Sequence, residues 1–219
     1  MIYRFTLLTL MLVVMAPALR ADNDRLKDAA LVLTEMAGAG DTGIPQNLLA
    51  KSKCVVVIPA VKKAAFVVGA QYGRGYISCR TTDPAGWSAP GAVRIEGGSV
   101  GFQIGGSETD VLMIVMNDRG VERLLSNKFT LGADAGVAAG PVGRQATAQT
   151  DATMRAEMLA WSRSRGVFAG VALQGSTLRE DDSEIEELYG SKLTNREIVT
   201  SRRASPVAAA TLMSALSRY

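Results

Sequence analysis

Short β-branched runs separated by glycine, proline and aspartate fill the middle of this 219-residue chain, and no other feature limits its possible folds as strongly. Such runs are short for helices and carry residues that pack well on a pleated sheet. They are Val55 to Ile58, Ala64 to Tyr72, Gly98 to Ile104, Val111 to Met116 and Val167 to Gln174. The sequence therefore predicts a β-rich core of antiparallel strands, arranged as a sandwich or as a barrel-like sheet.

Two adjacent lysines, Lys62 and Lys63, stand between the first two of these runs. Pro59 has no N–H group for a strand ladder, so the first strand is predicted to end there and the lysines to lie in the connection that follows. Three glycines bracket Arg74 and predict a tight reversal around it. They are Gly69, Gly73 and Gly75. Several cations would then share one end of the sheet.

Helical patterns flank the strands on both sides. Asp22 to Ala37 has apolar residues at helical spacing and is followed by a glycine stop. The other predicted helices are Pro45 to Lys51, a short one capped by Asn117, Asp182 to Tyr189, one opened by a capping box at Thr194 to Glu197, and one that starts at Ser205-Pro206. Met154 to Ser162 fits either a helix or a strand, and we favour a strand around Trp161. The predicted fold class is α+β, with N- and C-terminal helices flanking the β-rich core.

The first 18 residues have the composition of an export signal. Arg4 precedes an apolar stretch from Phe5 to Met15, and Ala16-Pro17-Ala18 supplies the small residues of a cleavage site. The stretch is shorter than the roughly 20 residues that span a bilayer, and an uncleaved anchor is the alternative. We therefore expect a signal peptide at 1–18 and one domain at 19–219, with a core at about 25–190 and a helical tail at 191–219. The expected location is the periplasm or cell envelope, peripheral to a membrane.

The chain has two cysteines, Cys54 and Cys79. An even number of cysteines in an exported protein favours a disulfide, and antiparallel strands could bring these two together. Two unpaired buried thiols are the alternative. A bridge here would be structural, because the chain has no C-x-x-C pair for redox chemistry.

The chain contains no histidine, so the commonest general base and most zinc sites are absent. We therefore expect no enzyme activity, no metal and no cofactor. Glycine blocks at 97–106 and 132–143 match no phosphate-binding loop. The acidic run from Glu180 to Glu187 is interpreted as a solvated helix start, and it lacks the spacing of a calcium loop.

Part of the chain resembles the SYLF domain family. The motifs that carry the resemblance are VVIP, KKA, GAQYGRG, a cysteine and GWSAP between Val56 and Pro90, then GGSVGFQIGG from Gly97, TD at Thr109 and VMN ending at Asn117. Glycine-rich segments at 132–143 and 166–171 continue the match in order, so that it spans about 25–190. The resemblance implies a lipid-binding module. Eukaryotic relatives bind phosphoinositides, some of them, such as the yeast-type proteins, bind actin filaments, and bacterial relatives are mostly envelope proteins.

For this chain, the resemblance implies non-catalytic binding of anionic phospholipid at an envelope membrane. Lysine is a flexible point charge suited to lipid phosphates. The predicted lipid-binding residues are Lys62, Lys63, Lys51, Lys53 and Arg74. Trp87, in a Gly/Pro loop, is a membrane-contact candidate, and a loop or core anchor is the alternative. A solvated turn is the alternative for the lysine pair.

The expected partner is an anionic phospholipid or membrane surface. The second function considered is an envelope structural or protein-interaction module, with an envelope protein as partner. A formal net charge of +3 is too small to indicate nucleic-acid binding. An exported chain without an SH3 or FYVE module in its sequence would meet neither actin nor phosphoinositides, so actin binding is expected to be doubtful.

Overall fold

The computed structural model describes residues 16–40, 43–66, 68–82, 85–100, 105–126, 128–131, 136–141, 156–164, 167–170 and 175–219. The strands are β1 (Cys54–Phe66), β2 (Val68–Thr82), β3 (Ala85–Trp87), β4 (Gly91–Val100), β5 (Gly105–Val115), β6 (Lys128–Thr130), β7 (Val137–Ala139), β8 (Met158–Ser164), β9 (Val167–Gly170) and β10 (Thr177–Glu180). The helices are α1 (Ala16–Gly38), α2 (Gln46–Lys51), α3 (Asp118–Leu124), α5 (Asp182–Tyr189), α6 (Asn195–Thr200), the 3-10 turn η3 (Val207–Ala209) and α7 (Ala210–Leu216).

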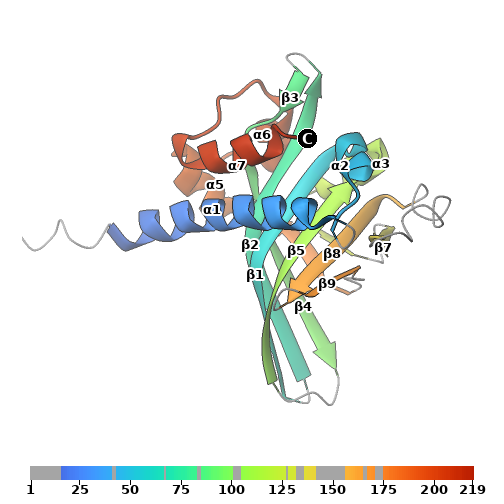
Figure 1. Cartoon of the computed structure of the whole chain (residues 1–219). Helices are drawn as coiled ribbons and strands as arrows, with labels where there is room; N and C mark the ends of the chain where they lie inside the picture. Colours follow the sequence, from blue (N-terminus) through green and yellow to red (C-terminus); the bar gives the residue numbers. More distant parts are fainter. Residues whose placement is uncertain are drawn as a thin grey trace, which may run out of the picture.

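The strands form one ten-stranded sheet in the order β6-β10-β4-β2-β1-β5-β8-β7, with β3 on β2 and β9 on β8. All pairs are antiparallel except β7 with β8. The sheet is strongly twisted and curled, and its four central strands continue well beyond α1 (Figure 1). The predicted α+β fold with an antiparallel, β-rich core and flanking helices is confirmed, and a single curled sheet corresponds to the barrel-like form of that prediction.

Both faces of the sheet are buried in its middle. Val55 and Val57 belong to the core that includes the buried face of α1, whereas Val56 and Ile58 belong to the core on the opposite face. This two-sided burial explains why the strand is a continuous apolar run and not an alternating one. α1 lies across the strands, with α7 beside it (Figure 1).

α1 begins at Ala16, six residues before the predicted start, so Ala16-Pro17-Ala18 lies within its first turn, where proline is tolerated. The rest of the predicted signal peptide, 1–15, lies outside the described residues. Leu26 and Leu33 of α1 are fully buried against the sheet. No helix in the described part of the chain has the length and apolar character to cross a membrane.

The prediction that Lys62 and Lys63 lie in a connection between strands is wrong. Both lie inside β1, which continues past Pro59 to Phe66 and pairs with β2 and β5 on either side. The pairing register shifts between Ile58 and Val61, and Ala60 adopts a φ of 52° there. A bulge thus lets the strand pass its proline. The Ala60 N–H donates to Oδ1 of Asp110 at 3.0 Å.

The predicted reversal around Arg74 is also wrong, because Gly69, Gly73 and Gly75 all lie within β2. At Gly75 the reason for glycine is the close approach of two backbones. A Cβ on Gly75 would lie 2.1 Å from the Val57 carbonyl oxygen. The strand needs glycine there because the bulged part of β1 presses against it.

Several local predictions are confirmed. Cys54 and Cys79 are directly opposite on β1 and β2 and form a disulfide. The Asn117 side chain accepts a hydrogen bond from the Gly120 N–H and caps α3, and Thr194 with Glu197 forms the predicted capping box of α6. β8 is a strand around Trp161, as favoured. Predicted strand residues 101–104 and 171–174 lie outside the described part of the chain.

Candidate functional site

The predicted lipid-binding residues do not form one cluster. Lys51 is the last residue of α2 and Lys53 directly precedes β1, whereas Lys62 and Lys63 lie about 30 Å further along the strand, at roughly 3.3 Å per residue. Lys62 and Lys63 point to opposite faces of the sheet because they are adjacent in a strand. The structure therefore divides the set between two places, a basic end near α2 and a cleft below α1.

Arg80, at the end of β2, assembles the basic end, which we define as Lys51, Lys53, Arg80 and Arg218. Its guanidinium donates to the backbone oxygens of Ala50, at 3.2 Å, and of Tyr219, at 2.6 Å. Its backbone N–H donates to the Lys53 carbonyl at 2.7 Å. These contacts fix the end of α2 and the end of α7 against β2. Four cationic residues from segments far apart in sequence are thereby brought to one end of the sheet, where the Arg218 side chain also lines a groove between α1 and α7.

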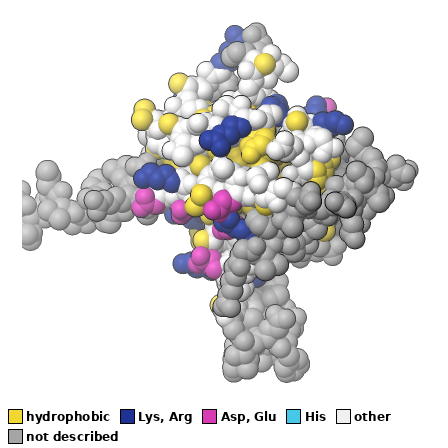
Figure 2. Space-filling model, in the orientation of Figure 1, with side chains coloured by type: hydrophobic (Ala, Val, Ile, Leu, Met, Phe, Trp, Pro, Cys, Tyr) yellow, Lys and Arg dark blue, Asp and Glu magenta, His cyan; other side chains and the backbone are white. Residues whose placement is uncertain are grey.

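The charges of the basic end are only partly balanced. Lys53 pairs with Asp118 at 2.6 Å, whereas Lys51 and Arg218 are exposed and form no ion pair among the described residues. Partial burial lowers the pKa of Arg80 from its ordinary value, which still leaves a guanidinium charged at neutral pH. In Figure 2, acidic side chains gather at the level of α1, below this end.

Trp87 lies beside the basic end on β3, which pairs with the end of β2. The Arg80 guanidinium stacks over its ring, 4.2 Å from the ring centre. The indole ring is half-buried against the core, and its N–H has no hydrogen-bond partner among the described residues. Trp87 is therefore in part an anchor that packs against the core, as the alternative interpretation held. Its ring also borders a cationic surface.

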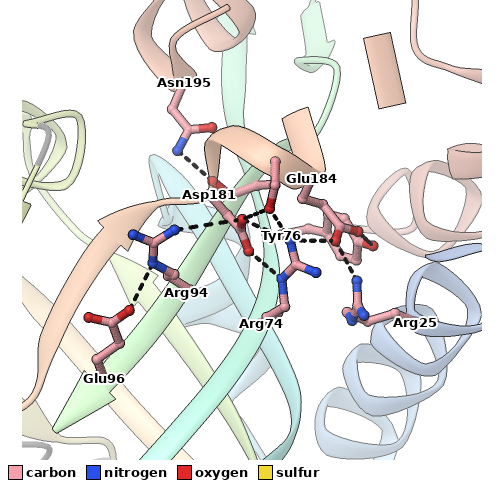
Figure 3. A network of polar contacts seen from close by, with 10 residues as sticks. Arg25, Arg74, Tyr76, Arg94, Glu96, Asp181, Glu184 and Asn195 are labelled. Carbon is pink, nitrogen blue, oxygen red and sulfur yellow. Dashed lines mark hydrogen bonds and ion pairs between the residues drawn. The ribbon is translucent and has the colours of Figure 1, made fainter. Parts of the chain in front are cut away.

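Arg74, predicted to contact lipid, belongs to a buried polar network (Figure 3). Its Nε donates to Asp181 at 2.5 Å, and its Nη2 lies 3.3 Å from Glu184. Glu184 also pairs with Arg25 of α1 at 2.5 Å and accepts a hydrogen bond from the Tyr76 hydroxyl. Both carboxylates are 1% exposed. The positive charge of Arg74 is therefore matched inside the protein.

The network shifts the pKa values of its members. Burial pushes the pKa of Asp181 upward, but hydrogen bonds from Arg74 and Ser183 outweigh burial and leave it below its ordinary value. The hydrogen bond to Asp181 raises the pKa of Arg74. Burial, and next the charge of Glu184, raise the pKa of Tyr76. At neutral pH Arg74 and Asp181 are therefore both charged, and Tyr76 is neutral.

The acidic run is not a solvated helix start throughout. Asp181 and Glu184 point inward and are buried, while their neighbours Asp182 and Ser183 are exposed. Spacing by three residues puts two side chains on one helical face, and that pattern was the available signal. The sequence contained no signal for their partner, because Arg74 is 107 residues away from Asp181.

The cleft lies between α1 and the strands β1 and β2, beside this network, and has a volume of about 310 Å³. Arg25 and Asp28 of α1 line one side. Lys62, Tyr72 and Arg74 line the other, and the bulge at Ala60 forms part of the wall. Its size is at the lower end of the range typical of small-molecule sites.

Comparison with known proteins identifies the family. The family model described as Ysc84, Las17-binding protein actin regulator, matches residues 96–219. An SH3 domain-containing protein of Schizosaccharomyces pombe, PJ696.02, is 37% identical over 169 residues, which cover 76% of this chain and 39% of that protein. Protein YSC84 of Saccharomyces cerevisiae is 33% identical, with 90% of this chain and 43% of that protein covered. Human SH3 domain-containing YSC84-like protein 1 is 33% identical, with 88% and 58% covered.

The chain thus spans between about two fifths and three fifths of the length of these relatives. The family description names actin regulation, and another relative is LAS seventeen-binding protein 3 of Saccharomyces cerevisiae, which is 32% identical. The expectation that actin binding is doubtful is therefore wrong as a statement about this family. With more than half of its length matched by the family model, the chain belongs to the Ysc84, or SYLF, family of regulatory binding proteins.

Proposed function

We propose that this chain is a non-catalytic module that binds anionic phospholipid through its basic end. The observation that carries the proposal is the convergence of Lys51, Arg80 and Arg218 on one end of the sheet, where Lys51 and Arg218 are exposed and lack ion-pair partners in the described part of the chain. Each cation near an anionic leaflet contributes about 1 kcal/mol. Three such charges support reversible attachment.

Trp87 supports the same surface. Tryptophan favours the membrane interface because its ring is apolar and its N–H is polar. Here the half-buried ring borders the Arg80 guanidinium, whereas the N–H is buried and takes no part in the proposed contact.

The test is vesicle co-sedimentation with phosphatidylcholine vesicles that contain or lack phosphatidylglycerol. We expect the wild-type chain to bind only the anionic vesicles, and less tightly as salt rises, because salt screens exposed charges. Lys51→Glu with Arg218→Glu should weaken binding by about 2 kcal/mol or more, which is roughly thirtyfold. Both side chains are exposed, so thermal stability should change little.

Lys62→Glu with Lys63→Glu is the matched charge-reversal variant on β1, and it should bind these vesicles like the wild type. Loss of binding in that variant alone would place the lipid surface on β1, as the sequence predicted, and not at the basic end. No binding of any anionic vesicle by the wild type would exclude the proposed function.

The proposal extends to the location of the protein. We infer export to a periplasmic or envelope membrane, because the first 18 residues have the order of an n-region, an apolar core and a small-residue cleavage site. N-terminal sequencing of the protein recovered from an exporting host should give a chain that starts near Leu19. A sequence that begins at Met1 would contradict cleavage.

The family description favours a second candidate function, in which the module binds a protein of the actin-regulating machinery. Co-sedimentation with actin filaments tests it under the same buffer conditions. Pelleting with filaments but not with anionic vesicles would replace the lipid proposal with this one.

A further inference from the structure

The cleft below α1 contains two opposite charges that the fold leaves unpaired. Lys62 and Asp28 both line it, and neither forms an ion pair among the described residues. Lys62 is an exposed residue, and Asp28 projects from α1. They come from elements on two sides of the cleft, so that a small ligand could contact both.

The other cations of the cleft do not add to its net charge. The charge of Arg74 is matched by Asp181, and that of Arg25 by Glu184. These two arginines are therefore held rigidly in place by buried carboxylates. What remains for a ligand is one positive and one negative group, so the cleft is poorly suited to a simple anion of high charge.

The charges around the cleft are mixed, because acidic residues of β5 lie close to both Asp28 and Lys62. Burial raises the pKa of Asp110, and the negative charges of Glu108 and Asp28 raise it further, so Asp28 belongs to an acidic neighbourhood. Lys62 lies directly across from Tyr72 of β2 and from Glu108 of β5, and it forms no ion pair with Glu108 among the described residues. The charges that line the cleft and have no ion-pair partner among the described residues are thus Lys62 on β1 and Asp28 on α1.

The walls of the cleft suit a small and partly apolar ligand. Tyr72 is 49% exposed, unusually open for a large ring, and forms part of the wall. The backbone at the Ala60 bulge closes another side, in a left-handed conformation held by Asp110. Such strain in a non-glycine residue is concentrated at functional sites in proteins.

We propose that this cleft binds a small zwitterion that carries a phosphate and an ammonium group, of the phosphoethanolamine type, with the phosphate on Lys62 and the ammonium on Asp28. Tyr72 contacts the short carbon chain between them. The ligand is either the free molecule or the headgroup of phosphatidylethanolamine. Lys62 is about 30 Å along β1 from Lys53 of the basic end, and the proposed ligand needs no contact with the basic end.

The test is a titration of the isotope-labelled full chain, followed by nuclear magnetic resonance in a phosphate-free buffer. The ligands are O-phosphoethanolamine, inorganic phosphate and ethanolamine. We expect O-phosphoethanolamine to bind at least tenfold more tightly than either fragment, because only it satisfies both charges. Shifted amide signals should lie around Ala60, Lys62 and Tyr72.

Variants identify the two contacts. Lys62→Ala and Asp28→Asn should each weaken binding of O-phosphoethanolamine at least tenfold. Lys63→Ala, on the opposite face of the same strand, and Asp24→Asn, one turn earlier in α1, are the matched controls and should bind like the wild type. Equal affinities for O-phosphoethanolamine and phosphate, no binding at all, or equal losses in variants and controls would overturn the proposal.

Competition separates the two sources of the ligand. If vesicles that contain phosphatidylethanolamine displace O-phosphoethanolamine and pure phosphatidylcholine vesicles do not, the ligand is the lipid headgroup. If neither vesicle displaces it, the ligand is the free molecule. The same vesicles lack phosphatidylglycerol, so this result is independent of the test of the basic end.

Discussion

At the scale of single residues, Gly75 is the described glycine at which an added Cβ would come closest to backbone atoms. A Cβ there would lie 2.1 Å from the Val57 carbonyl oxygen and 2.7 Å from the Ile58 Cα, and neither atom can move without breaking the β1 ladder. Gly75→Ala should therefore destabilise the protein by about 3 kcal/mol or more, at the upper end of the cost of overpacking. Urea denaturation measures the change.

Gly98→Ala is the matched control for that substitution. Gly98 also lies within a strand, but the nearest atom to its added Cβ would be 3.8 Å away and the position is exposed. We expect Gly98→Ala to change the free energy of unfolding by no more than about 0.5 kcal/mol. Similar losses of stability in Gly75→Ala and Gly98→Ala would mean that glycines in these strands stabilise the fold for a reason other than close approach of backbones.

Asp181 makes the stability of the fold depend on pH. Its pKa is lower in the folded chain than the value of about 3.9 in an unfolded one, so the stability it contributes is complete above about pH 4 and is lost as pH falls through the folded pKa. Asp181→Asn should cost about 3 kcal/mol at pH 7, because it leaves Arg74 without its buried partner. In urea titrations, the difference in free energy of unfolding between wild type and Asp181→Asn should shrink below pH 4. Asp182 is exposed, so Asp182→Asn should leave both the stability at pH 7 and its pH dependence unchanged.

At the scale of elements, the disulfide joins the first residue of β1, Cys54, to Cys79 on the adjacent strand β2. Cys54 and Cys79 are 25 residues apart and both are buried. In the chain-entropy model, a loop of this length stabilises by about 3.5 kcal/mol. Cys54→Ala with Cys79→Ala should lower the free energy of unfolding by about that amount, and reduced wild type should match the variant. Two reactive thiols per chain in denatured, unreduced protein recovered from an exporting host would show that the bridge does not form.

The same elements show what sequence patterns can predict. Asn117 as a cap of α3 and the Thr194 capping box were predictable because each depends on residues three apart. The course of β1 was not, because Pro59 normally ends a strand and only pairing with β2 and β5 carries the chain through the lysines. Long-range pairing outweighed the local signal.

At the scale of the whole molecule, the candidate sites depend on contacts between distant parts of the chain. Arg80 reaches the backbone of Tyr219, 139 residues away, and this contact completes the basic end. Arg25 of α1 meets Glu184 of α5 across 159 residues. The sequence supplied the types of residue, namely exposed lysines and arginines, but only the folded sheet determines which of them lie together. The lipid-binding set predicted from one stretch was therefore divided between two places.

The proposed lipid binding through the basic end predicts a defined orientation on a membrane, with the basic end toward the lipid and the long ends of β1 and β2 away from it (Figure 1). The two tryptophans report on it, because Trp87 borders the basic end while Trp161 is 1% exposed and donates to the Pro141 carbonyl in the core. With vesicles of phosphatidylglycerol and brominated phosphatidylcholine, fluorescence of the Trp161→Phe variant should be quenched and that of Trp87→Phe should not. If Trp161→Phe fails to fold, subtracting the fluorescence of Trp87→Phe from that of the wild type gives the signal of Trp87. Equal quenching of both tryptophans would mean that the chain binds in no fixed orientation, and quenching of neither would move the lipid contact away from the basic end.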